Sequence, residues 1–198
     1  MNRRDFNQLA CSQLALSQAA LGGVAALTVD SAFAIDYLSP EKARIVLIPS
    51  AASFVDITVQ LNAEQMAAVG RLGRITPRST QWRLSQAIND QGQVIGAFVV
   101  DNVIGKYELI TYAVAVSASG AVSGVEVLSY RESHGGEIRL PAWRKQFVGK
   151  TTRDPIEVGN DIALISGATL SSVHVTDGVR RINAVLEVAR DVWTKKQA

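Results

Sequence analysis

Between residues 80 and 128, short apolar segments rich in β-branched residues alternate with turn sequences, and this pattern constrains the fold most strongly. Residues 94–100 form one such run, and residues 109–116 and 122–128 form two more, separated by Ser-Ala-Ser-Gly at 117–120. Two runs joined by a short glycine-containing turn are typical of a β-hairpin. Because a parallel pair needs a long crossover, strands joined by short turns pair antiparallel. The segment predicts an antiparallel β-sheet.

The C-terminal region shows a different period. Apolar side chains recur at steps of three or four residues from Val175 to Trp193, which is the period of a helix. Arg180 and Arg181 fall off this apolar stripe, and we expect them on the solvated face. The region predicts one long C-terminal helix.

Three shorter elements complete the prediction. A helix is expected over residues 61–69, with Asn62 as its N-cap and Gly70 and Gly73 ending it. Residues 141–148 begin with proline and predict a short helix. Asp161 to Ile165 predicts a short buried strand. The fold class is α+β, with helices packed on an antiparallel sheet.

Composition excludes several function classes. The formal net charge is +2 and the basic residues do not gather into one block, which argues against binding to nucleic acid. The single cysteine is Cys11, and the two histidines, His134 and His174, are too few for a histidine-rich metal site. We expect no metal site, so redox chemistry would need an organic cofactor or a metal shared with another chain.

Residues 1–34 predict a cleavable signal peptide. Two arginines open the chain, a weakly apolar stretch follows from about residue 14 to 29, and residues 31–34 supply a small-x-small cleavage pattern. The apolar stretch is too short and too polar to span a bilayer comfortably. The mature protein is expected to be a single domain over residues 35–198.

The first residues also indicate an export route. Asn-Arg-Arg-Asp-Phe at residues 2–6 resembles the twin-arginine motif, although Asn7 and Gln8 depart from its usual pattern and leave the general secretory route open. Either route predicts a periplasmic or otherwise extracytoplasmic protein.

A turn of small residues precedes the C-terminal helix: residues 166–172 read Ser-Gly-Ala-Thr-Leu-Ser-Ser. Gly167 and Ala168 have almost no side chain, so another molecule can approach their backbone closely. The first N–H groups of the following helix lack internal partners, and its dipole favours an anion. A phosphate suits such a place. The same residues also suit an ordinary turn and helix cap.

The Ser-Gly-Ala-Thr-x-Ser sequence after an apolar stretch resembles the flavinylation motif of the FMN-binding domain family. That family includes the C subunit of sodium-pumping NADH:quinone reductase and the G subunit of Rnf-type complexes. The resemblance covers about residues 95–193, including a hairpin at 109–128 and a glycine-bearing loop at 132–137. Two departures are a shorter loop and an aspartate, Asp161, displaced from its usual spacing before the motif.

The resemblance implies that Thr169 carries FMN as a covalent phosphoester, made by an ApbE-like FMN transferase, with Ser171 as the alternative acceptor. His174 could add positive charge near the phosphate if protonated, or simply lie on the helix surface. The other residues implied to contact the cofactor are Ser166, Gly167, Ala168, Ser172, Glu132, Ser133 and His134.

The implied function is an exported electron-transfer flavoprotein whose partner is a quinone- or haem-linked membrane redox protein. Two alternatives stay open: a periplasmic flavin-dependent reductase acting directly on an acceptor, and a non-catalytic exported binding domain without flavin. No G-x-G-x-x-G fingerprint supports an NAD(P)H site.

Overall fold

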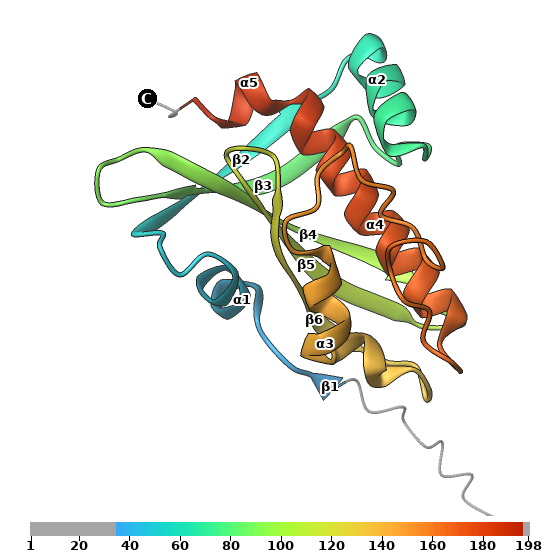
Figure 1. Ribbon diagram of the computed structural model, residues 1–198. Helices are drawn as coiled ribbons and strands as arrows, with labels where there is room; N and C mark the ends of the chain where they lie inside the picture. Colours follow the sequence, from blue (N-terminus) through green and yellow to red (C-terminus); the bar gives the residue numbers. More distant parts are fainter. Residues whose placement is uncertain (1–34, 196–198) are drawn as a thin grey trace, which may run out of the picture. The chain divides into compact units, whose positions relative to one another are not determined.

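The computed structural model describes residues 35–195, which fold around one antiparallel β-sheet (Figure 1). The strand order is β1-β6-β5-β4-β3-β2, so most strands pair with their neighbours in sequence. The strands are β1 (Ile35–Asp36), β2 (Ser53–Gln60), β3 (Gln81–Ile88), β4 (Val94–Ile104), β5 (Leu109–Ser117) and β6 (Val122–Tyr130). The predicted antiparallel sheet is confirmed.

Helices pack on this sheet, and the longest of them lies near the C-terminus (Figure 1). They are α1 (Pro40–Leu47), α2 (Ala63–Gly73), α3 (Pro141–Arg144), α4 (Thr169–Val188) and α5 (Arg190–Trp193), with 3-10 turns η1 (Gly136–Arg139) and η2 (Lys145–Phe147). The predicted C-terminal helix is therefore α4, followed after Ala189 by the short α5. The α+β class with a long C-terminal helix is confirmed.

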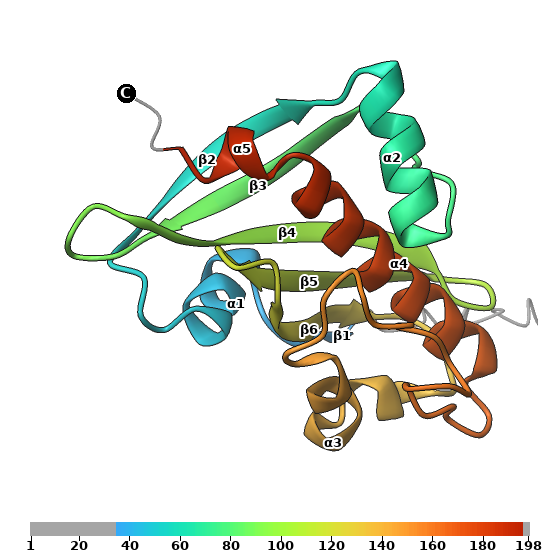
Figure 2. The ribbon, with the colours of Figure 1, turned by 45° about the horizontal axis from the view of Figure 1, so that its top comes forward.

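The two faces of the sheet are covered by different helices (Figure 2). Successive strand residues point to opposite faces. In β5, Tyr112, Val114 and Val116 belong to the large core cluster that contains the buried face of α4. Ala113 and Ala115 belong to the smaller cluster under α1. The larger core on the α4 face is the one that holds the start of that helix in place.

The start and end of α2 show how local chemistry sets a helix. Asn62 accepts a hydrogen bond from the backbone of Gln65, whose side chain accepts one from the backbone of Asn62, forming a capping box. The predicted N-cap is confirmed. The prediction that Gly70 ends the helix is wrong, because an interior glycine only weakens a helix and α2 continues to Gly73. Arg74 then adopts the left-handed conformation at the C-cap.

The predicted strand at residues 161–165 is wrong: this segment is irregular. Ile162 is buried, so the apolar run does enter the core. Side chains replace the strand ladder, since the N–H of Ala163 donates to Gln146 Oε1 and its carbonyl accepts from Trp143 Nε1. Periodicity over so short a run does not distinguish a strand from a buried loop.

The prediction that Arg181 lies on a solvated face is also wrong. Its side chain is only 4% exposed, and a guanidinium nitrogen lies 3.7 Å from a carboxylate oxygen of Asp101 on β4. Burial lowers the pKa of Arg181. Tyr112 donates to the same carboxylate, and burial together with Asp101 raises the pKa of that tyrosine. A charged pair beneath α4 can complete an apolar stripe when each charge has a partner.

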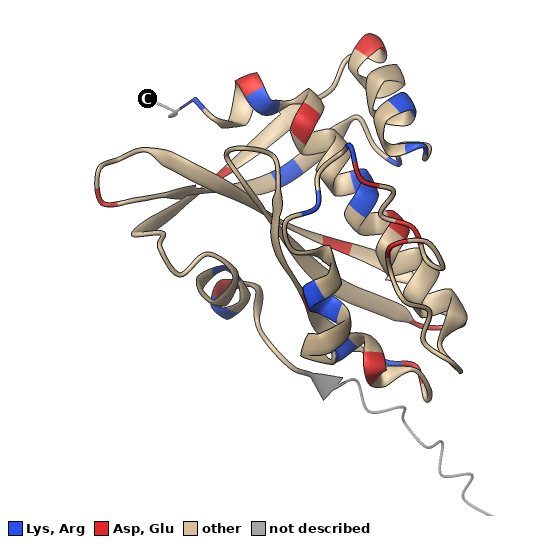
Figure 3. Ribbon diagram, viewed as in Figure 1, with Lys and Arg blue, Asp and Glu red and all other residues tan. Residues whose placement is uncertain are grey.

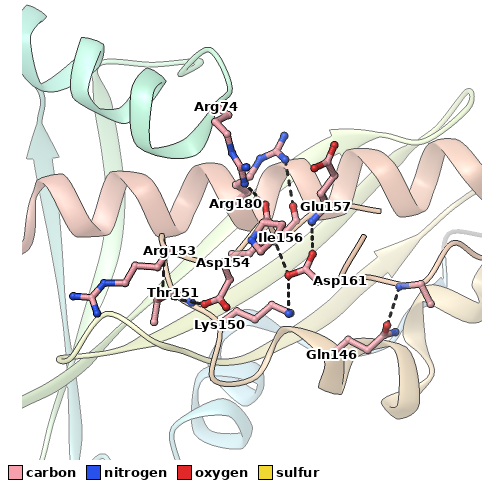
Figure 4. A network of polar contacts seen from close by, with 12 residues as sticks. Arg74, Gln146, Lys150, Thr151, Arg153, Asp154, Ile156, Glu157, Asp161 and Arg180 are labelled. Carbon is pink, nitrogen blue, oxygen red and sulfur yellow. Dashed lines mark hydrogen bonds and ion pairs between the residues drawn. The ribbon is translucent and has the colours of Figure 1, made fainter. Parts of the chain in front are cut away.

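A polar network holds the loop before α4 against the helix (Figure 4). Asp161 accepts hydrogen bonds from Lys150 Nζ at 2.7 Å and from the backbone N–H groups of Ile156 and Glu157 at 3.1 and 2.8 Å. Arg180 of α4 donates to the carbonyl of Ile156. The loop that leads to the small-residue turn is thus anchored by side-chain chemistry.

The signal-peptide and export predictions concern residues 1–34, which lie outside the described residues. Cleavage after Ala34 would leave β1 intact. Across residues 35–195, no helix has both the length and the apolar character needed to cross a membrane.

Candidate functional site

Three segments that are distant in sequence meet at one pocket of about 330 Å³. They are the turn between β4 and β5, the loop after β6, and the start of α4 (Figure 2). The volume is at the lower end of the roughly 300–1,000 Å³ typical of ligand pockets. The lining residues are Lys106, Tyr107, Glu132, Ser133, His134, Gly167, Ala168, Thr169, Leu170 and Ser171.

The start of α4 offers backbone donors to this pocket. Thr169 is the first helical residue and its side chain is exposed. Gly167 has a φ of +81°, and nothing lies within 4 Å of the position that a Cβ would take. No side chain caps the helix, and its first turn contains no acidic residue. The first N–H groups are therefore free to bind an anion, and the arrangement fits a phosphate.

The other hydroxyls of the turn are engaged or turned away from the pocket. Ser171 is 4% exposed, and its Oγ lies 3.1 Å from the hydroxyl of Tyr130. Ser172 is fully buried and donates to the carbonyl of Ala168 at 2.9 Å. Ser166 is exposed and is absent from the pocket lining. Among the four hydroxyls, only that of Thr169 is both exposed and part of the lining.

The loop after β6 is packed directly on the turn. The Tyr130 hydroxyl donates to the carbonyl of His134, and Ser171 can donate to the same hydroxyl. Burial raises the pKa of Tyr130, which keeps this donor protonated. Gly135 has a φ of +90°, and a Cβ there would lie 2.4 Å from the Cβ of Ala168. The close approach of loop and turn requires glycine.

Glu132 contacts the third segment. Its Oε1 accepts hydrogen bonds from the N–H groups of Tyr107 at 2.6 Å and Glu108 at 3.0 Å. Burial raises the pKa of Glu132, but these backbone donors and Lys106 outweigh burial and hold it below its usual range. A Cβ at Gly105 would lie 2.5 Å from the same carboxylate oxygen. Glu132 therefore fixes the β4–β5 turn at the edge of the pocket.

The remaining candidates occupy less constrained positions. Ser133 and His134 are exposed in the lining, and the serine Oγ lies 2.9 Å from His134 Nδ1. His174 contacts the carbonyl of Ile104 through Nδ1 and is absent from the pocket lining. Its position matches a structural contact at the end of β4.

Sequence reasoning missed Lys106, Tyr107 and Leu170 in the lining. Tyr107 is 76% exposed, and Lys106 Nζ lies 4.8 Å from the centre of its ring. The available signal was Gly105, which interrupts the apolar pattern and marks a turn. That turn reaches the start of α4 only through the pairing of β4, β5 and β6.

Other hollows of the surface lie away from this turn. Two larger ones, of about 420 and 510 Å³, lie beside α1, and neither is lined by a residue of the 166–172 turn. Within residues 35–195, no group of three or more His, Cys, Asp or Glu side chains is placed to hold a metal ion. Acidic and basic residues are interspersed along the described part of the chain (Figure 3).

Comparison with known proteins places this pocket in a family. Residues 105–183 match the model of the FMN-binding domain. They belong to the FMN-binding domain family. The matched segment begins beside Lys106 and extends through most of α4, so it contains every residue that lines the pocket. The predicted family resemblance is confirmed.

Individual relatives agree with this membership. One component of the Na⁺-translocating ferredoxin:NAD⁺ oxidoreductase complex of Acetobacterium woodii, its RnfG-type protein, is 29% identical over 44% of this chain and 47% of its own length. The chain thus spans about half the length of this curated relative. The crystal structure of Shewanella oneidensis NqrC matches with a TM-score of 0.55 at 17% identity, covering 77% of this chain and 96% of NqrC. At that identity the likeness shows a shared fold.

Proposed function

We propose that this protein carries FMN in a phosphoester bond to Thr169 and passes electrons to or from a membrane redox partner outside the cytoplasm. One observation carries the proposal: an exposed threonine hydroxyl stands at the uncapped start of a 20-residue helix, inside the pocket of an FMN-binding domain. Bound flavin would supply the redox chemistry, while the protein supplies tethering and orientation.

The burial of the hydroxyls supports Thr169 over Ser171 as the acceptor. Ser171 is 4% exposed and lies against Tyr130, so a transferase would have to disrupt that contact to reach it. Thr169 needs no rearrangement. In the transfer, the Thr169 oxygen bonds to phosphorus, its proton is released, and the bond from phosphorus to the leaving nucleotide of a flavin dinucleotide breaks.

Residues around the turn would hold the phosphate and the pocket shape. The first-turn N–H groups of α4 would bind the phosphate oxygens, and the open space at Gly167 admits them. Tyr130 and Gly135 keep the neighbouring loop in contact with the turn. Ser133 and His134, exposed in the lining, would contact the ribityl chain or the ring.

Export and partnership complete the proposal. Residues 1–34 would direct the chain across the cytoplasmic membrane, and an FMN transferase would modify the mature domain there. The Acetobacterium woodii relative is a component of an oxidoreductase complex, which favours a membrane electron-transfer protein as the partner here.

Intact-mass spectrometry after co-expression with an FMN transferase tests the attachment. The mature protein is expected to gain the mass of one FMN less water and to stay yellow after denaturation. Thr169→Ala should gain nothing, because it removes the acceptor oxygen.

Ser171→Ala is the matched control, since it removes a hydroxyl two residues away and should still be modified. Modification of Thr169→Ala but not of Ser171→Ala would reassign the acceptor. If the unmodified sequence never gains the mass in the presence of an active transferase, covalent attachment is excluded.

A further inference from the structure

The pocket contains an aromatic side chain to which attachment of FMN at Thr169 assigns no role. Tyr107 lies in the turn between β4 and β5 and lines the same pocket as Thr169. At 76% exposed, it has the most exposed ring or large apolar side chain of the described residues. A tyrosine has a broad apolar face, so this exposure leaves an unused surface for stacking.

The backbone beneath this ring is held in a fixed position. Its N–H donates to Glu132 Oε1, and so does the N–H of Glu108. The N–H of Gly105 donates to the carbonyl of Glu108 at 2.8 Å and closes the turn. Since Glu132 belongs to the loop packed on the small-residue turn, Tyr107 is tied to the start of α4 by a short chain of contacts.

The chemistry of the ring face indicates what it would receive. The ammonium of Lys106 already lies 4.8 Å from the ring centre, which shows that the face accepts an electron-poor partner. An exposed cation of this kind is held weakly and can move away. A flat, electron-poor ring system would occupy the same face with far more contact area.

We propose that Tyr107 stacks on the isoalloxazine ring of the FMN attached at Thr169, and that Glu132 is the positioning residue for this contact. The inference rests on the proposed function, because it requires the flavin at that residue. A phosphoester tether keeps the local concentration of the ring high, so one stacking contact suffices to dock it. The docked ring would lie at the open edge of the pocket, where a redox partner can approach.

Time-resolved flavin fluorescence of the covalently loaded protein tests the contact. A tyrosine in contact quenches flavin emission, so the decay should contain a short-lived component from the stacked ring. Tyr107→Leu should lower the ratio of stacked to unstacked ring about 2- to 10-fold. Tyr107→Trp should keep the short-lived component, because tryptophan also stacks and quenches.

Two further variants make the test specific. Tyr37→Leu removes a tyrosine from a different hollow, beside α1, and should leave the decay unchanged. Glu132→Gln keeps Tyr107 but removes the charge that anchors its backbone, so the stacked fraction should fall while the FMN mass is retained.

The outcomes separate the two proposals. A fully loaded protein without a short-lived component, or with the same decay in Tyr107→Leu, overturns the stacking inference and leaves the attachment at Thr169 intact. A protein that never gains the FMN mass overturns both.

Discussion

Gly135 and Gly149 have similar left-handed backbones but different surroundings. Their φ angles are +90° and +83°. A Cβ at Gly135 would lie 2.4 Å from the Cβ of Ala168, whereas nothing lies within 4 Å of one at Gly149. A side chain in the left-handed region costs about 1–2 kcal/mol. The pair therefore separates backbone strain from close packing.

Gly149→Ala is expected to destabilise the protein by about 1–2 kcal/mol through strain alone. Gly135→Ala should cost about 1–3 kcal/mol more, because the new methyl group collides with Ala168. Urea unfolding of both variants measures the difference. We also expect slower flavinylation for Gly135→Ala only, since the displaced Ala168 precedes Thr169. Equal unfolding costs would show that loop and turn are not in contact.

At the scale of the element, α2 and α4 each contain an interior glycine, and the two should respond oppositely to alanine. Nothing lies within 4 Å of a Cβ at Gly70, whereas a Cβ at Gly178 would lie 1.9 Å from the hydroxyl oxygen of Tyr112. Gly178 is thus the point where α4 approaches β5 most closely.

Gly70→Ala should stabilise the protein by about 0.8–1 kcal/mol, because alanine is the better helix former. Gly178→Ala should instead destabilise it by about 1–3 kcal/mol, since overpacking outweighs helix propensity. Thermal and urea unfolding of the two variants test the sign of each change.

Tyr112→Phe provides the check on the cause. It removes the atom nearest to the new methyl group, so the double variant with Gly178→Ala should be less destabilised than the two single changes added together. Additive effects would place the damage elsewhere in the helix.

Across the whole molecule, the long connection between β6 and α4 depends on ionised carboxylates. Burial raises the pKa of Asp161, but Lys150 and the N–H groups of Glu157 and Ile156 outweigh it and lower the pKa overall. The pKa of Asp154 is lowered by the backbone and side chain of Thr151. Glu132 shifts in the same direction.

A lowered folded-state pKa stabilises the protein above the unfolded pKa, near 3.9 for aspartate, and this contribution is lost as the pH falls through the folded value. Stability should therefore be constant near neutral pH and fall below about pH 4. Urea midpoints measured at pH 7 and pH 3 test this expectation.

Asp161→Asn should cost about 1–3 kcal/mol at pH 7, because the charged hydrogen bonds are lost, and should lose less further stability at pH 3. Asp90→Asn, in the exposed turn between β3 and β4, is the control and should behave like the unmodified protein. If Asp161→Asn keeps the full acid dependence, other carboxylates dominate it.

Sequence patterns predicted the elements whose signal is local. The β-branched runs became β4, β5 and β6, the apolar stripe became α4, and the Asn62 cap was correct. The failures share one cause. Residues 161–165 were irregular and Arg181 was buried, because long-range partners supplied the hydrogen bonds and charge that local patterns cannot reveal.

The sequence by itself determined the chemistry of the small-residue turn, since hydroxyls, a glycine and a following helix are properties of adjacent residues. Tertiary structure decided which of those hydroxyls faces a pocket, because Tyr130 and the core bury Ser171 and Ser172 while leaving Thr169 exposed. It also brought Tyr107 to that pocket through strand pairing. Burial and proximity depend on contacts between distant residues, and no spacing along the chain encodes them directly.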